Sequence, residues 1–202
     1  MILESIVTTQ GPGGEINVAP MGPVVNEALT QFRLRPFQTS TTFRNLQMHP
    51  EGVIHVVDDV LLIARGAIGA LTECPPTFPP RIVTGAVLQS ACRYFEFRVI
   101  HCDASQLRSE IDVEIVHSAT LRDFWGFNRA RHAVLEAAIL ATRLHLVPPA
   151  EIEAEFRRLE SPLQKTAGPR ELEAFALLQD YVRQHLDRRA NHNPAGPPPT
   201  LP

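Results

Sequence analysis

The hydrophobic pattern of this chain changes its period near residue 125, and that change limits the folds open to it. Residues before this point read mainly as short β-rich runs in which apolar and polar positions alternate. Ile111, Val113 and Ile115, for example, alternate with Asp112 and Glu114, which predicts a half-buried antiparallel strand. The residues after this point have apolar positions spaced as on one face of a helix. Closed antiparallel barrels produce such strands, so we predict a mainly β protein with α-helices at its C-terminal end.

Turn and capping signals divide this pattern into elements. Gly11-Pro-Gly-Gly14 predicts the turn of an opening hairpin, and His49-Pro50 predicts the end of a short helix that begins at Ser40. The predicted strands cover residues 3–9, 16–19, 29–37, 53–57, 82–99 and 111–115. The predicted helices cover residues 40–48, 60–71, 128–146, 151–159 and 169–186. On residues 82–99, Phe95, Phe97 and Val99 share one face of the strand, and Tyr94, Glu96 and Arg98 share the other.

These elements suggest three parts along the chain. We expect a barrel domain over residues 1–125 and a helical subdomain over residues 126–188. The apolar stripe of the last helix would seal the barrel or pack against a partner subunit. We expect the proline-dense tail over residues 189–202 to be disordered.

Composition excludes several classes of protein. The 202 residues are 44% hydrophobic and 20% charged, which is ordinary for a soluble globular protein. A net charge of -3 argues against a general nucleic-acid binder. No apolar run is long enough to span a bilayer, and Glu4 lies where a signal peptide needs an apolar core, so we expect a cytoplasmic protein. Three cysteines without C-x-x-C spacing and scattered histidines predict neither a disulfide framework nor a metal site.

Three consecutive hydroxyl residues, Ser40 to Thr42, open the short helix predicted at 40–48. A helix N-terminus with unpaired N–H groups and hydroxyls favours binding of a phosphate. Arg35 lies upstream, and Asn45 lies one helical turn from Thr41 and Thr42, so these side chains can converge on one anion. A simple N-cap, which needs only one hydroxyl, is the alternative interpretation.

A second polar segment, Asn17-Val-Ala-Pro-Met-Gly22, ends one of the predicted strands. Small Ala19 would let a flat ring approach, Pro20 has no N–H, the Asn17 amide can match a ring imide, and Met21 can lie against its face or edge. Asn before a turn is also often only a turn former. A ring site and a phosphate site together suggest a phosphorylated cofactor, for which flavin mononucleotide (FMN) is the best candidate.

Several motifs together resemble the domain-of-unknown-function 447 family of FMN-binding split barrels. They are residues 1–9, 17–22, 35–37, 58–59, 86–97, 122–133 and 165–170, and the run Asp-Phe-Trp-Gly-Phe-Asn-Arg-Ala-Arg-His is the most specific of them. The resemblance implies an FMN-binding split β-barrel with a C-terminal helical cap. It also implies a homodimer with FMN at or near the subunit interface, related to flavin reductases, with a hint of pterin-linked one-carbon metabolism.

The resemblance also assigns residues to the cofactor. It implies that the strand end borders the ring, through Asn17, Ala19, Pro20 and Met21. The helix start would bind the phosphate, through Thr39, Ser40, Thr41, Thr42 and Asn45, with Arg35 and Phe37 in support. His55 departs from relatives that often have Asn at this strand position, and it is interpreted either as a plain core or surface histidine or as a titratable group near the flavin.

Other polar residues have two interpretations each. Asp58 and Asp59 are a carboxylate pair for acid–base work or a helix cap and its neighbour. Asn128, Arg131 and His132 lie close to one face of a predicted helix, so they form either a substrate-anion cluster or a cap with a basic strip.

The leading expectation is an FMN-dependent oxidoreductase of flavin reductase type, in which the cofactor carries the hydride or electron. One alternative is a non-catalytic flavin-binding or interaction module linked to one-carbon metabolism. Another is a structural protein that has lost the cofactor. We expect no nucleic-acid or membrane partner, and the sequence names no substrate.

Overall fold

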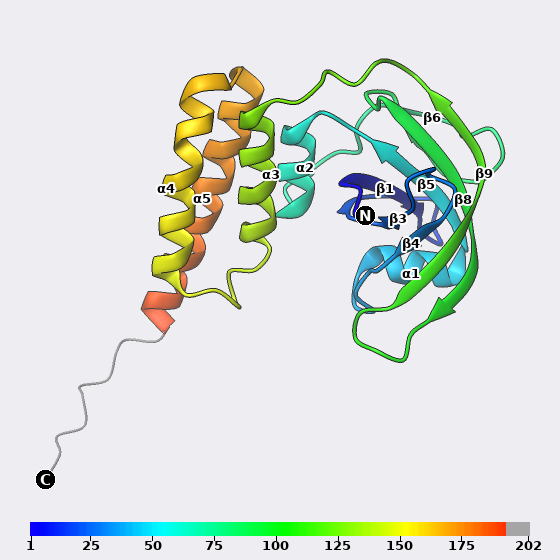
Figure 1. Cartoon of the computed structure of the whole chain (residues 1–202). Coiled ribbons are helices and arrows are strands. Elements are labelled where there is room, and N and C mark those ends of the chain that lie inside the picture. The colour runs from blue at the N-terminus through cyan, green and yellow to red at the C-terminus, as the bar shows by residue number, and fades with distance from the viewer. Residues whose placement is uncertain (193–202) are drawn as a thin grey trace, which may run out of the picture. The chain divides into compact units, whose positions relative to one another are not determined.

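The computed structural model describes residues 1–192, which divide after Phe127 into a β-rich unit and a helical unit (Figure 1). The sequence predicts a boundary after residue 125. Residues 189–192 are helical rather than part of a disordered tail, and residues 193–202 of the predicted tail lie outside the described residues.

A seven-stranded antiparallel sheet forms most of the first unit, in the order β2-β1-β5-β8-β9-β4-β3. Its strands are β1 (Ser5–Gln10), β2 (Ile16–Met21), β3 (Val24–Val25), β4 (Phe32–Leu34), β5 (Glu51–Val56), β8 (Arg93–Asp103) and β9 (Glu110–Thr120). The long strands β8 and β9 curl around the shorter ones (Figure 1). A separate two-stranded sheet contains β6 (Thr77–Phe78) and β7 (Val87–Leu88).

The segment just ahead of β1 pairs with β3, the edge strand at the far end of the sheet. Ile2 forms an isolated bridge with Val24 of β3, and the Val25 N–H donates to the Met1 carbonyl at 2.8 Å. The Leu3 N–H likewise donates to the carbonyl of Pro23 at 3.1 Å. The segment before β1 thus pairs with β3, while the body of β1 pairs with β2. This exchange of partners closes the sheet into a barrel-like shape.

Alternation along the strands forms two apolar clusters. Phe95 and Phe97 lie buried inside the barrel, where the ring of Phe95 is 5.0 Å from that of Phe32. Tyr94, one residue away from Phe95, faces the opposite side and packs with Val83 and Val87. The predicted division of this strand into two faces is therefore confirmed. Bulges near Phe97 and Ile100 interrupt the β8–β9 pairing and bend these long strands.

The opening hairpin and the N-caps of the two helices of this unit are as predicted. The turn contains Gly14 at a φ of +87°, a conformation that favours glycine. Helix α1 (Thr41–Met48) begins after the N-cap Ser40 and ends at His49. Helix α2 (Val60–Ala67) begins after Asp59, whose carboxylate accepts from the first-turn N–H groups of the helix.

Three predicted elements of this unit are too long. The strand predicted at 82–99 begins only at Arg93, as β8, because a loop, the short β7 and a turn occupy residues 82–92. The strand predicted at 29–37 is reduced to β4, because a turn with Leu29 at a positive φ precedes it and Pro36 follows it. The helix predicted at 60–71 ends at Ala67, and Gly69 then adopts a left-handed conformation.

The helical unit contains α3 (Arg129–Ala141), α4 (Pro149–Thr166) and α5 (Pro169–His192). Alanines line the buried face of α3, among them Ala133 and Ala137. The prediction continued α3 to Leu146, but the helix ends at Ala141 and Leu146 is exposed. Helix α4 is longer than predicted and contains Pro162. Across residues 1–192, no helix has the length and apolar character needed to cross a membrane.

Candidate functional site

A hydrogen-bonded cluster joins the two polar segments that the sequence analysis singled out. The Asn17 side-chain amide on β2 donates to the hydroxyl of Thr42 on α1 at 3.1 Å. It also lies 3.4 Å from the hydroxyl of Thr9 on β1. The amide of Asn45 donates to the same Thr9 hydroxyl at 3.1 Å. Three predicted site residues therefore meet in one cluster, and Thr9 is added to them.

Local structure explains this meeting. The hairpin register places Thr9 directly opposite Asn17. Thr42 and Asn45 lie three residues apart in α1, so both project from one face of that helix. Thr9, Thr42 and Asn45 are buried, whereas Asn17 is half-buried on a strand that pairs only with β1 among the described strands. The cluster thus runs from the buried face of α1 to a partly accessible strand edge.

The N-terminus of α1 has more hydrogen-bond donors than the helix itself uses. First-turn N–H groups of a helix have no intrahelical partner, and the Ser40 hydroxyl accepts only that of Phe43, at 3.2 Å. The Arg44 guanidinium folds back over this end of the helix. It donates to the Thr39 carbonyl at 2.7 Å and to the Thr41 hydroxyl at 3.1 Å. Backbone donors, hydroxyls and a cation therefore lie together here, a combination that suits an anion.

Arg35 and Phe37 lie on the segment that leads into α1. The Arg35 Nε is buried without a hydrogen-bond partner within residues 1–192. The Phe37 ring is 56% exposed, and the Arg108 guanidinium lies 5.2 Å from its centroid. Arg108 also donates to the Arg35 carbonyl at 2.8 Å. This segment supplies a second cationic and aromatic surface next to the start of α1.

The remaining predicted ring residues lie along β2. Ala19, Pro20 and Met21 are all half-buried. Pro20 packs against α2, where a Cβ added to Gly66 would lie 2.7 Å from the Pro20 Cδ. Met21 packs against the barrel core. Packing therefore occupies Pro20 and Met21. Asn17 and Ala19, which lie on the same strand face as Met21, are the residues left to contact a ligand.

His55 lies in the core of the barrel. It is fully buried, its Nδ1 is 3.1 Å from the Ile6 carbonyl, and its Nε2 accepts the Leu88 N–H at 3.1 Å. Accepting at Nε2 and donating at Nδ1 describes a neutral imidazole. Burial lowers the pKa of His55 to about 4, although the contact with the Ile6 carbonyl opposes this effect. Of its two interpretations, the structure supports the core histidine.

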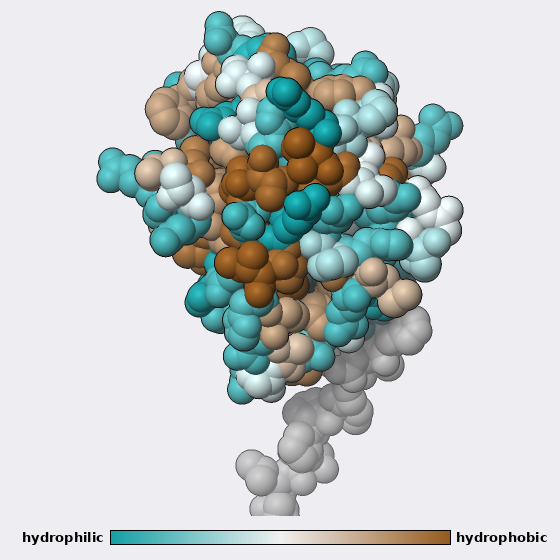
Figure 2. All heavy atoms as spheres, turned by 90° about the vertical axis from the view of Figure 1, so that its right-hand side faces the viewer, coloured by the Kyte–Doolittle hydropathy of each residue, from teal (hydrophilic) through white to brown (hydrophobic). Residues whose placement is uncertain are grey.

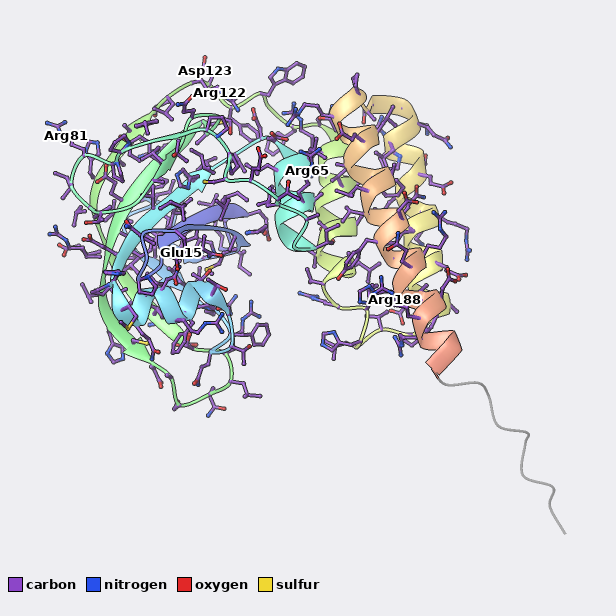
Figure 3. All side chains as sticks on the ribbon, turned by 180° about the vertical axis from the view of Figure 1, so that it is seen from behind. Glu15, Arg65, Arg81, Arg122, Asp123 and Arg188 are labelled. Carbon is purple, nitrogen blue, oxygen red and sulfur yellow. The ribbon has the colours of Figure 1, made fainter. Side chains whose placement is uncertain are left out.

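The adjacent carboxylates Asp58 and Asp59 do not act as a pair. Asp59 caps α2, as described above, whereas Asp58 accepts two hydrogen bonds from the Arg122 guanidinium, at 2.5 and 2.9 Å. Asp58 also accepts the Trp125 N–H at 3.1 Å. Arg122, labelled in Figure 3, therefore anchors the segment that precedes the helical unit. This is the structural interpretation of the pair rather than the acid–base one.

The residues predicted from the second unit have structural contacts of their own. Asn128 caps α3 through the Arg131 N–H at 3.1 Å, and its amide donates to the Thr166 carbonyl at 3.0 Å. Arg131 forms an ion pair with Glu171 at 3.0 Å. His132 is exposed. The cap is confirmed, and the substrate-anion interpretation of these residues stays a prediction.

Sequence reasoning missed Thr9 and Arg108 as candidate site residues, whereas Arg44 is visible in the sequence as a basic residue beside the hydroxyl run. The place of Thr9 depends on hairpin register, and that of Arg108 on the pairing of Phe37 with Arg108. Neither of these pairings leaves a local signal in the sequence.

Two hollows of the described surface lie away from the cluster. One, of about 840 Å³, is lined by residues of β3, β4 and β9, and the other, of about 450 Å³, by residues of α4 and α5. No group of three or more His, Cys, Asp or Glu suited to a metal occurs within residues 1–192.

Comparison with solved structures identifies the fold. An FMN-bound protein from Methanosarcina mazei, of the same family model, has a TM-score of 0.76 at 24% identity and covers 89% of this chain and 94% of that chain. Flavoredoxin from Methanosarcina acetivorans has a TM-score of 0.51 at 11% identity and covers 59% and 68% of the two chains. The fold is therefore that of the FMN-binding split barrels, with added helices, as predicted.

Family models specify the relationship further. The N-terminal domain described as "Protein of unknown function (DUF447)" matches residues 3–122, and the second domain of that family matches residues 128–180. The chain belongs to this family, which confirms the resemblance seen in its motifs. No curated protein gives a significant match.

Proposed function

We propose that this chain binds FMN, with the phosphate at the N-terminus of α1 and the isoalloxazine ring along the end of β2. The observation that carries this proposal is the cluster of Thr9, Asn17, Thr42 and Asn45, which brings a strand edge and a helix N-terminus into one site. The FMN bound in the structure of the relative from M. mazei supports it.

The residues present suit such a ligand. The first-turn N–H groups, the hydroxyls of Thr41 and Thr42, and the Arg44 guanidinium would hold the phosphate. The buried Arg35 Nε, which has no partner within residues 1–192, adds a cationic donor on the adjoining segment. Asn17 commits its NH₂ group to Thr42 and Thr9, so its carbonyl oxygen is left to accept the N–H of a ring imide.

We further propose that the protein is an oxidoreductase. FMN would supply the hydride or electron transfer, and the chain would bind and orient it. The residues of the cluster carry only amides and hydroxyls, none of which titrates in the neutral range. A module that holds FMN without turnover is the alternative, and reduction of the bound flavin by NADH or NADPH under anaerobic conditions separates the two.

We infer a homodimer in a reducing compartment such as the cytoplasm. Figure 2 shows hydrophobic side chains gathered on one face of the molecule, which is a common mark of an interaction surface. Ile82, Ile100 and Leu107 of the β-rich unit are among the exposed large apolar residues. The three cysteines are free, which suits a reducing environment. The molar mass of the FMN-loaded protein in solution tests the dimer.

Replacement of Thr42 or Asn45 by alanine tests the assignment of the site. Thr42→Ala removes a proposed hydrogen bond to the phosphate, and a hydrogen bond to a charged group contributes about 1.5–3 kcal/mol. Asn45→Ala removes the amide that ties α1 to Thr9, so each variant should weaken FMN binding about tenfold. Titration of flavin fluorescence measures this, with Thr120→Ala on exposed β9 as the control. Unchanged FMN affinity in both Thr42→Ala and Asn45→Ala would overturn the assignment.

A further inference from the structure

Thr9 occupies an unusual place in the candidate site. Its side chain is almost fully buried, with 1% of the residue exposed, so it presents little surface to a ligand. Its hydroxyl oxygen nevertheless accepts from the amides of both Asn17 and Asn45. Because those amides belong to β2 and α1, one hydroxyl on β1 links the two elements that the proposed cofactor has to bridge.

The hydrogen bonds to Thr9 set the orientation of the Asn17 and Asn45 side-chain amides. A side-chain amide has donors on one side and a carbonyl oxygen on the other, so fixing its NH₂ group also fixes the direction of the oxygen. Thr9 engages the NH₂ group of Asn45 at 3.1 Å and that of Asn17 at 3.4 Å. Without this hydroxyl, the NH₂ group of Asn45 loses the buried acceptor that it has here.

We propose that Thr9 is a positioning residue of the FMN site: its hydroxyl holds Asn17 and Asn45 in register, and so couples the ring side of the site to the phosphate side. This inference rests on the proposed function. The positioning role predicts a preference for FMN over riboflavin, in addition to an effect on the affinity for FMN. FMN has to satisfy both sides at once, whereas riboflavin lacks the phosphate and depends on the ring side alone.

Thr8 supplies a matched control on the same strand. It is equally buried, at 1% exposed, and its hydroxyl donates to the Ala86 carbonyl at 2.7 Å. Neighbouring residues of a strand face opposite sides, so Thr8 points away from the cluster. Thr8→Val and Thr9→Val each remove one buried hydroxyl with almost no change of shape. Only Thr9→Val removes a hydroxyl from the candidate site.

The experiment measures the Kd of FMN and of riboflavin for the wild type, Thr9→Val, Thr9→Ser and Thr8→Val, together with the Tm of each apo-protein. Thr9→Val should weaken FMN binding about tenfold, in line with the loss of an acceptor for a buried amide, and riboflavin binding by less. Thr9→Ser keeps the hydroxyl and should restore the preference for FMN. Thr8→Val should lower Tm without changing the ratio of the two Kd values.

The outcomes separate this inference from the proposed function. A wild type that binds no FMN overturns both. A wild type that binds FMN, with an unchanged FMN-to-riboflavin ratio in Thr9→Val, overturns the positioning role alone. A preference for FMN over riboflavin that falls in Thr9→Ser as far as in Thr9→Val would also contradict it, because the hydroxyl would then be irrelevant. If Thr9→Val does not fold, Thr9→Ala, which adds no bulk, replaces it with the same expected results.

Discussion

His55 illustrates how burial decides the chemistry of a single side chain in this barrel. The ring joins three strands, because it sits on β5, contacts the Ile6 carbonyl of β1 and accepts the Leu88 N–H of β7. Both nitrogens are used in the neutral form, and protonation would cost the hydrogen bond from Leu88. The departure from Asn at this position therefore serves the core.

The pKa of about 4 predicts a specific dependence of stability on pH. The unfolded chain takes up a proton at His55 near pH 6.5, whereas the folded chain resists protonation down to about pH 4, so stability falls as the pH drops through this window. The full effect is on the order of 3–4 kcal/mol. Urea unfolding of the wild type and of His55→Asn between pH 7 and pH 4 measures it. The variant should lose less stability over this range, and equal losses would contradict the account.

Sequence reasoning at this scale succeeded where chemistry is local. The run of hydroxyls predicts where a helix begins, and Ser40 is the cap in the structure. The phosphate site at the same place stays a prediction. The sequence analysis did not identify Thr9 as a site residue, because nothing in the neighbouring sequence distinguishes it from Thr8. Only the register of β1 against β2 decides that Thr9 faces Asn17. That register depends on the exact geometry of the hairpin turn, which the glycine-rich run at residues 11–14 does not specify by itself.

At the scale of elements, a buried carboxylate organises the loop between β6 and β7. Glu96 on β8 is fully buried and accepts three consecutive backbone N–H groups, those of Arg81 at 2.7 Å, Ile82 at 2.6 Å and Val83 at 3.0 Å. Arg81, labelled in Figure 3, marks this loop. The loop covers the second apolar cluster of the sheet, in which Val83 packs with Tyr94.

Glu96→Gln should therefore destabilise the β-rich unit. The neutral amide keeps one oxygen for three donors and brings an NH₂ group into a site built of donors, so we expect a loss of about 2–3 kcal/mol. Glu114→Gln, on the exposed face of β9, should change stability by less than about 0.5 kcal/mol. Chemical unfolding of both variants measures the difference, and a Glu96→Gln protein as stable as the wild type would refute this role.

Helices and strands were predicted correctly where each of their faces is either wholly buried or wholly exposed, and where turns and caps have clear sequence signals. The hairpin, the two faces of β8 and the caps of α1 and α2 follow from alternation and turn chemistry. The helix predicted at residues 151–159 stops before Pro162, a residue type that removes a helical hydrogen bond. The structure carries the helix through Pro162 to Thr166, whose hydroxyl donates to the Pro162 carbonyl at 2.8 Å. The end of α4 also has contacts to the start of α3, where the Asn128 amide donates to the Thr166 carbonyl at 3.0 Å and the Ala130 N–H to the Thr166 hydroxyl at 3.0 Å. Such tertiary contacts can override local propensity.

At the scale of the whole molecule, the change of period near residue 125 predicted both the β-rich unit and the helical unit. The fold class followed from this pattern, since short alternating strands can bury their apolar faces by closing on one another. The way the sheet closes, with Ile2 pairing Val24 ahead of β1, did not follow from it. Neither did the link between the strand end and α1, because segments so distant in the sequence meet only in the folded barrel.

The central claim is that this split barrel holds FMN, and a visible absorption spectrum tests it most directly. Purified protein is mixed with excess FMN, the unbound fraction is removed, and the spectrum is recorded beside that of the Thr42→Ala, Asn45→Ala double variant. The account predicts an oxidised-flavin spectrum that the wild type retains and the double variant loses. A wild type that stays colourless would contradict it.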